Sequence, residues 1–164
     1  MNKKALFTIL YLGNILLLNS QIREDLRVDA EIISRCKVQI SSNNISFTRV
    51  DPNAQLPIPQ NEPPIEVIVK GTFGRGEKVY LRIQAEGNLT DPISGQTIPA
   101  DTIYWEASGN GFANGTLAPS VPIGIGRWNK SGTYHGSLFF YFNNDPSYAP
   151  GVYFLTVNIT VSSF

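Results

Sequence analysis

Residues 151–164 read Gly-Val-Tyr-Phe-Leu-Thr-Val-Asn-Ile-Thr-Val-Ser-Ser-Phe and carry the most regular pattern in the chain. Large apolar side chains stand at every second position, namely Tyr153, Leu155, Val157, Ile159 and Val161. That period belongs to a β-strand with one buried face, whereas an amphipathic helix repeats its apolar residues every three or four positions. The stretch therefore predicts a strand over 153–161 whose apolar side chains share one face.

The same alternation recurs along the chain, and the segments between the repeats are rich in proline and glycine. Strands are predicted at 26–32, 37–41, 45–47, 65–69, 79–85, 102–107, 123–128 and 136–142. Loops are predicted at 51–64, 88–100 and 109–115, because proline cannot donate to a ladder and glycine favours turns. Helical periodicity is absent from the pattern after residue 20. Many short strands in a chain of 164 residues predict an all-β fold, an immunoglobulin-like β-sandwich.

The first twenty residues have the layout of a secretory signal peptide. Lys3 and Lys4 form a short basic region, residues 5–18 are mostly apolar, and Ser20 supplies a small residue for cleavage. The apolar run is short for a membrane span, although an uncleaved membrane anchor is the alternative. The predicted organisation is a signal peptide at 1–20, an N-terminal strand at 21–35 and a β-sandwich domain at 36–164, with no membrane span after cleavage.

Composition and charge disfavour several kinds of partner. Charged residues make up 16% of the chain, and the formal net charge is 0, or −2 once the two lysines of the signal peptide are removed. Such a balance creates no strong overall field toward nucleic acid or a membrane surface. The single cysteine, Cys36, rules out an internal disulfide. We expect its thiol to be buried like a small apolar group, the alternative being an intermolecular disulfide.

Catalytic, metal-binding and cofactor-binding motifs are missing from the sequence. One histidine, His135, and one cysteine do not make a standard zinc site, and neither a phosphate-binding loop nor a nucleophile elbow occurs. A Cys36–His135 dyad is a remote alternative, because Cys36 lies in a strand pattern without an activating group. We therefore expect a protein that is not an enzyme and that needs no cofactor or metal. Trp105 and Trp128 are expected in the core, a sugar-binding platform being the alternative.

Both ends of the predicted mature chain resemble a known family. Residues 26–38, which read Leu-Arg-Val-Asp-Ala-Glu-Ile-Ile-Ser-Arg-Cys-Lys-Val, resemble the start of spore-coat-U-like proteins, which are close to the pilins of archaic chaperone–usher systems of bacteria. Ile45-Ser46-Phe47 fits the same pattern. The C-terminal Pro150-Gly151-Val152-Tyr153 and the alternating residues up to Phe164 are similar to the closing strand of that family. The chain departs from the family in lacking a disulfide partner for Cys36.

The resemblance implies assembly by strand donation. Pilins of this family have a sandwich without its last strand, and the N-terminal extension of the next subunit fills the gap by β-augmentation. A strand that ends at Phe164 agrees with such a missing strand. The implied donor residues are Leu26, Val28, Ala30 and Ile32, and the implied edge of the acceptor groove is Tyr153, Leu155, Val157, Ile159 and Val161. The implied partners are like subunits, a periplasmic chaperone and an usher, for a fimbrial or adhesive protein that reaches the cell surface or the medium through the periplasm.

Two other functions are compatible with the sequence. In the first, residues 26–32 are an ordinary first strand of a self-contained sandwich, a secreted binding domain for carbohydrate or protein. In the second, the protein is an exported hydrolase, which would require a polar pocket with converging acids or His135. Removing residues 21–33 separates strand donation from a self-contained sandwich. A donating subunit would still fold around a donor peptide, whereas a self-contained sandwich would unfold.

Overall fold

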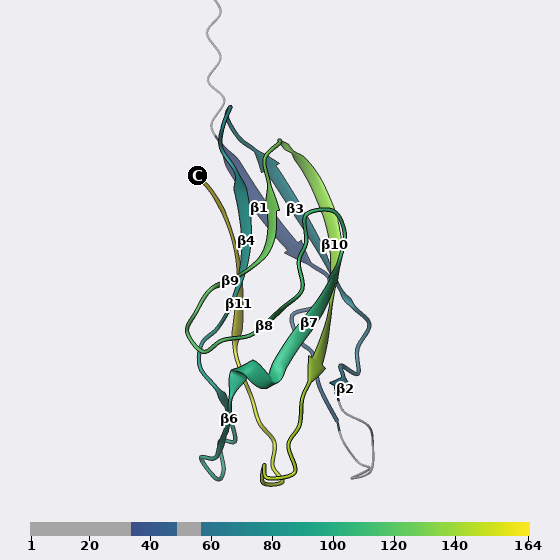
Figure 1. The fold of residues 1–164 in the computed structure, drawn as a ribbon, viewed down its shortest axis with the longest axis vertical. Helices are drawn as coiled ribbons and strands as arrows, with labels where there is room; N and C mark the ends of the chain where they lie inside the picture. Colours follow the sequence, from purple (N-terminus) through teal and green to yellow (C-terminus); the bar gives the residue numbers. More distant parts are fainter. Residues whose placement is uncertain (1–33, 49–56) are drawn as a thin grey trace, which may run out of the picture. The chain divides into compact units, whose positions relative to one another are not determined.

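Two antiparallel sheets form the layers of a β-sandwich in the computed structural model, which describes residues 34–48 and 57–164 (Figure 1). The strands are β1 (Arg35–Ile40), β2 (Ile58–Pro59), β3 (Ile65–Thr72), β4 (Val79–Ala85), β5 (Leu89–Thr90), β6 (Thr97–Ile98), β7 (Ile103–Ser108), β8 (Gly115–Thr116), β9 (Ile123–Trp128), β10 (Gly132–Phe142) and β11 (Val157–Ser163). The larger sheet has the order β1-β3-β10-β7-β8 with β2 paired to β10, and the smaller has the order β11-β4-β9. Strands β5 and β6 form a separate hairpin, followed by a 3-10 turn at Ala100–Thr102. The prediction of an all-β fold is confirmed.

The core consists of the inward-facing side chains of both sheets. Every second residue of β3 and β4 is buried, so that Val67 and Val69 of the larger sheet share one apolar cluster with Val79, Leu81 and Ile83 of the smaller. These side chains are β-branched or aliphatic and fit a pleated surface that is buried on one face. The alternation seen in the sequence at 65–69 and 79–85 is therefore the alternation between core and outer face.

Both tryptophans lie in this core, as predicted. Trp105 on β7 is 1% exposed and Trp128 on β9 is 5% exposed. Each indole N–H donates to a backbone carbonyl, that of Ala113 at 2.9 Å and that of Asn110 at 2.8 Å, respectively. A buried indole needs such an acceptor, because an unpaired N–H in an apolar environment destabilises the fold. The alternative of an exposed tryptophan platform for sugar is wrong.

Residues 45–47 do not form the short strand that their pattern predicts. The backbone N–H of Ser46 donates to the Glu62 carboxylate at 2.7 Å, and the Ser46 carbonyl accepts from the N–H of Asn61 at 2.9 Å. The backbone here is satisfied by the segment after β2 instead of by a ladder. The predicted loops at 51–64 and 88–100 hold the two-residue strand β2 and the β5–β6 hairpin, respectively.

Some predictions concern residues that the structure does not describe. The predicted signal peptide at 1–20 and the predicted strand at 21–35, except for its last two residues, lie outside the described residues. Within residues 34–48 and 57–164, no helix is both long enough and apolar enough to cross a bilayer.

The carboxylate of Glu62 links the stability of the fold to pH. Its oxygens accept hydrogen bonds from the hydroxyl and the backbone N–H of Ser46, both at 2.7 Å, and these bonds lower the pKa of Glu62. A carboxyl group with a lowered folded pKa stabilises the fold above its unfolded pKa, and this contribution is lost as the pH falls through the folded value. Lowering the pH from about 7 to about 3 should therefore reduce the free energy of unfolding less in Glu62→Gln than in the wild type. Urea unfolding at both pH values measures the two losses, and equal losses would contradict this role.

Candidate strand-binding edge of β1 and β11

Strand β11 forms a free edge of the smaller sheet. It pairs antiparallel with β4, from Val157 opposite Ala85 to Ser163 opposite Val79, and no other described strand pairs with it. Its inward side chains pack against the core but are only half-buried, whereas the inward side chains of β4 are fully buried. A central strand is covered by neighbours on both sides and an edge strand on one side only, which accounts for the difference.

The five predicted acceptor residues share the inward face, but only three of them belong to β11. Tyr153, Leu155, Val157, Ile159 and Val161 are all half-buried and pack against the core, with exposed residues between them. The strand begins at Val157 and not at Tyr153 as predicted. The reason is that Phe154 exchanges two backbone hydrogen bonds with Thr90 of β5, at 2.9 and 3.0 Å, which draws this part of the chain away from β4.

The hydrogen-bond pattern of β11 directs the backbone of its apolar residues toward the free edge. Just beyond the strand, Phe164 and Lys78 exchange both N–H···O bonds, at 2.7 and 3.0 Å. Hydrogen-bonded and non-hydrogen-bonded positions alternate along an antiparallel pair. In this register the polar residues Asn158, Thr160 and Ser162 are the ones that bond to β4. The N–H and C=O groups of the apolar residues between them therefore point away from the sheet.

Strand β1 forms a free edge of the larger sheet and has the same arrangement. The Ser41 N–H donates to the Glu66 carbonyl at 2.9 Å, one position past the end of the strand. By the same alternation, Cys36, Val38 and Ile40 direct their backbone groups outward. Cys36 and Val38 are half-buried against the core, and Ile40 is 40% exposed. The expectation that the Cys36 thiol is buried is met only in part, because the residue lies on an edge strand.

The two free edges lie next to each other although they belong to different sheets. Some Cα atoms of β1 lie within 8 Å of Cα atoms of β11. A strand hydrogen-bonded to both would need the two edges to lie about 9.6 Å apart, because paired strands lie roughly 4.8 Å apart. Where the edges are closest, they would have to separate to admit such a strand. We call the inward residues Cys36, Val38, Val157, Ile159 and Val161 the β1–β11 edge.

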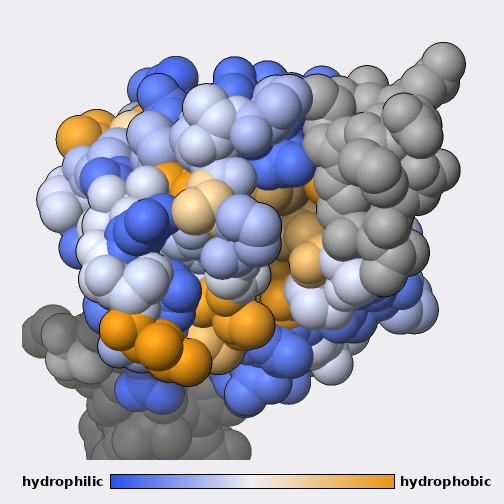
Figure 2. Space-filling model, turned by 90° about the horizontal axis from the view of Figure 1, so that it is seen from below, coloured by the Kyte–Doolittle hydropathy of each residue, from blue (hydrophilic) through white to orange (hydrophobic). Residues whose placement is uncertain are grey.

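The end of the sandwich that carries the β5–β6 hairpin and the loop before β11 has an apolar surface. Figure 2 looks onto this end and shows apolar side chains gathered there, some of them within a hollow. Val152 and Phe154, which lead into β11, are 64% and 63% exposed. Exposed apolar side chains that are grouped in this way are typical of contact surfaces.

The two residues of the alternative dyad, Cys36 and His135, lie at different positions of the larger sheet. Cys36 packs against the core, whereas His135 is exposed on β10 opposite Ile68, so the two residues do not form a dyad. Among residues 34–48 and 57–164, no three His, Cys, Asp or Glu side chains are grouped so as to hold a metal ion. At the start of β1, the Glu77 carboxylate accepts from the Ser34 hydroxyl and the Gly74 N–H, and both bonds lower the pKa of Glu77.

The four predicted donor residues, Leu26, Val28, Ala30 and Ile32, lie outside the described residues. Models of protein families and curated proteins provide no match to the sequence.

Sequence reasoning named β11 as an edge but missed β1 as its counterpart. The signal for a half-buried strand was present in the alternation of Cys36, Val38 and Ile40. That this strand is an edge follows only from the order of the strands in the sheet.

Proposed function

We propose that this protein is an exported, pilin-like structural or adhesive subunit that accepts the N-terminal strand of a neighbouring copy. Its sandwich would be immunoglobulin-like and incomplete, with the missing strand supplied at the β1–β11 edge. The observation that carries the proposal is the combination found on β11, where half-buried apolar side chains alternate with outward-directed backbone groups. An added strand uses both, because backbone hydrogen bonds supply affinity and the alternating side chains fix the register.

Residues 26–32 carry the pattern that complements such an edge. Leu26, Val28, Ala30 and Ile32 alternate with charged residues. Burying four apolar side chains contributes roughly 6–10 kcal/mol before the cost of ordering the segment. Ile33 and Ser34, which connect it to β1, lack the Asn-Gly chemistry of a tight hairpin turn. This sequence therefore favours donation to another copy over a tight hairpin with its own β1.

Further partners follow from the same proposal. A free edge with apolar side chains is prone to pair with the wrong chain, so such a subunit needs protection before assembly. A periplasmic chaperone would cover the edge and an usher would exchange it for the donor strand. The signal-peptide pattern at 1–20 provides the required export.

A self-contained secreted binding domain is the second candidate. It is favoured by the close approach of β1 and β11, whose Cα atoms come within 8 Å of each other and partly close the edge. In that case residues 26–32 would stabilise their own sandwich, and the β1–β11 edge would have no role in assembly.

Complementation between two disabled chains separates the candidates. Val28→Asp disables the donor segment, and Ile159→Asp disables the acceptor edge, because each places a charge among apolar side chains. We expect each variant alone to be monomeric in gel filtration with light scattering, and the equimolar mixture to form a heterodimer. Arg27→Asp and Thr160→Asp are the matched controls, because they change the neighbouring residues on the opposite face. Both controls should assemble like the wild type.

Two results would overturn strand donation. One is a mixture that remains monomeric while both variants keep the circular dichroism of a β-sheet protein. The other is a wild-type chain that stays monomeric and unfolds when residues 21–33 are removed, even with a peptide of residues 21–35 present. The second result would establish the self-contained sandwich.

A further inference from the structure

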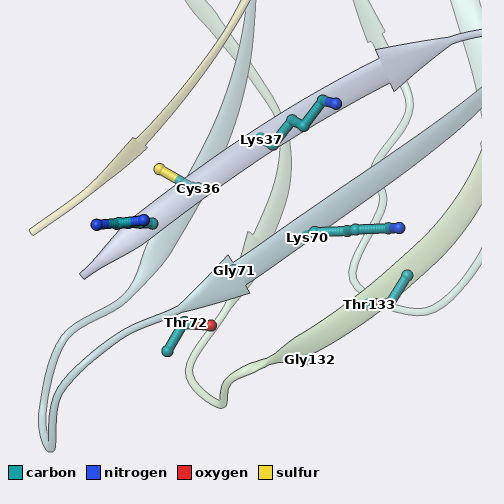
Figure 3. Close-up of a pocket in the computed structure, with 8 residues that line it drawn as sticks. Cys36, Lys37, Lys70, Gly71, Thr72, Gly132 and Thr133 are labelled. Carbon is teal, nitrogen blue, oxygen red and sulfur yellow. The ribbon is translucent and has the colours of Figure 1, made fainter. Parts of the chain in front are cut away.

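A hollow of about 550 Å³ lies on the larger sheet where β1, β3 and β10 run side by side (Figure 3). The register of these strands places three residues opposite one another, namely Cys36, Gly71 and Gly132. The side chain of Cys36 points toward the core, and a Cβ at Gly71 would point the same way. Their backbone forms the floor of the hollow on the outer face. One wall is the neighbouring row of Arg35 and Thr72, and the other is the row of Lys37, Lys70 and Thr133.

Among the described residues, the walls bring three positive charges together without a negative one. Lys37 and Lys70 occupy directly opposite positions on β1 and β3, and Arg35 lies on the same face two residues earlier. All three side chains are exposed, and no acidic residue of 34–48 or 57–164 lines the hollow. Like charges directly opposite each other on neighbouring strands destabilise a sheet. An anion bound between the two lysines would remove that repulsion.

The other lining residues indicate what kind of anion fits. Thr72 and Thr133 add hydroxyl groups at the same walls, which can donate to or accept from a sugar hydroxyl. The part of the chain that the structure describes contributes no aromatic or large aliphatic side chain to the lining. Binding of single-stranded nucleic acid typically uses aromatic stacking, and an amphipathic segment that docks to a membrane inserts an apolar face. Three cations are also few for duplex DNA, whose binding proteins typically contact about six to ten phosphates.

We propose that this hollow binds the sulfate or carboxylate groups of an acidic polysaccharide. Arg35, Lys37 and Lys70 pair with the anionic group, and the two threonine hydroxyls contact the sugar. The site lies on the outer face of β1, whereas the β1–β11 edge consists of side chains that face the core. Its occupant is therefore different from the donor strand, and the proposal stands whether or not the subunit accepts a strand.

The test measures binding of the full chain to heparin, which carries sulfate, and to alginate, which carries only carboxylate. Neutral dextran, phosphatidylglycerol vesicles and a 20-base-pair DNA duplex serve as comparisons. We expect binding to at least one acidic polysaccharide, weakening with salt, and stronger than binding to the comparisons. Binding of alginate would show that carboxylates suffice, whereas binding of heparin alone would indicate that sulfate is needed.

The decisive variant is Lys37→Glu. It should weaken polysaccharide binding at least about tenfold, because it exchanges an attractive for a repulsive charge beside the ligand. It should also leave the melting temperature unchanged or higher, because the new carboxylate would stand opposite Lys70 and replace a like-charge pair by an opposite-charge pair. Lys70→Glu is the reciprocal variant, with the same expectation. Arg127→Glu, which makes the same change of net charge on β9 of the other sheet, should keep the affinity within about twofold.

Three outcomes would overturn the proposal. In the first, neither heparin nor alginate binds measurably at low salt. In the second, the wild type and Lys37→Glu bind polysaccharide equally well. In the third, the protein binds vesicles or DNA more tightly than both polysaccharides. The melting temperature separates a lost site from a lost fold, so a loss of binding in a folded variant can be assigned to the hollow.

Discussion

Replacing Trp105 by alanine is expected to lower the free energy of unfolding by about 3–5 kcal/mol. The indole is 1% exposed and lies 6.1 Å, centroid to centroid, from the ring of Phe140. Gly115 on the neighbouring strand β8 has no side chain at the place where this ring packs, since a Cβ there would lie 2.4 Å from the indole. Gly115 therefore has no side chain that could move into the space that alanine leaves. A domain of this size has only about 5–15 kcal/mol of stability, so the loss would be a large part of the total.

Guanidinium unfolding followed by circular dichroism measures this loss. Trp105→Phe separates the two contributions of the side chain, because it keeps an aromatic ring but removes the N–H that donates to the Ala113 carbonyl at 2.9 Å. We expect it to lose clearly less stability than the alanine variant. A loss below about 1 kcal/mol for Trp105→Ala would be inconsistent with a residue at the centre of the core.

The sequence predicted those strands whose position depends on local pattern. Residues 65–69 and 79–85 alternate between β-branched or aliphatic residues and polar ones, and they form the two central strands β3 and β4. Alternation of this kind reports burial on one face and needs no knowledge of the partner strand. The same reasoning placed the apolar residues of 153–161 on one face, which the structure confirms.

Features that depend on distant partners could not be read from the pattern. The start of β11 is decided by Thr90, which bonds to Phe154, and the irregular backbone at Ser46 is decided by the carboxylate of Glu62. Local periodicity contains neither pairing. For the same reason the sequence gives no sign of the basic hollow, because Lys37 and Lys70 are brought together only by the register of β1 with β3.

Proline-rich residues 57–64 show how a segment with only a two-residue strand, β2, is fixed to the sandwich. Gln60 is 5% exposed and lies beside Phe140 of β10. Its backbone N–H donates to the Phe140 carbonyl at 2.9 Å, and its side-chain Oε1 accepts from the Phe140 N–H at 2.7 Å. The side-chain amide thus takes the place of a backbone carbonyl in the ladder. Its Nε2 donates to the carbonyls of Glu62 and Pro63, at 3.1 and 2.7 Å.

Replacing Gln60 by leucine is therefore expected to lower the free energy of unfolding by about 3 kcal/mol. Leucine has nearly the same volume but leaves the Phe140 N–H and two backbone carbonyls without their partner, and an unsatisfied buried group costs roughly 1–3 kcal/mol. Asn61→Leu is the matched control. Asn61 is the next residue and is exposed, with an amide that bonds to the hydroxyls of Ser46 and Thr48. We expect the control to lose less than about 1 kcal/mol.

Urea unfolding of both variants at neutral pH tests this assignment, and hydrogen exchange at Phe140 locates the effect. The Phe140 amide should exchange faster in Gln60→Leu relative to amides of β4, because its acceptor is gone while the core of the other sheet is unchanged. Equal losses of stability in the two variants would mean that the buried amide has no special role. The Pro-rich segment would then be held by apolar contacts such as that of Ile58, which is 7% exposed, and not by hydrogen bonds to β10.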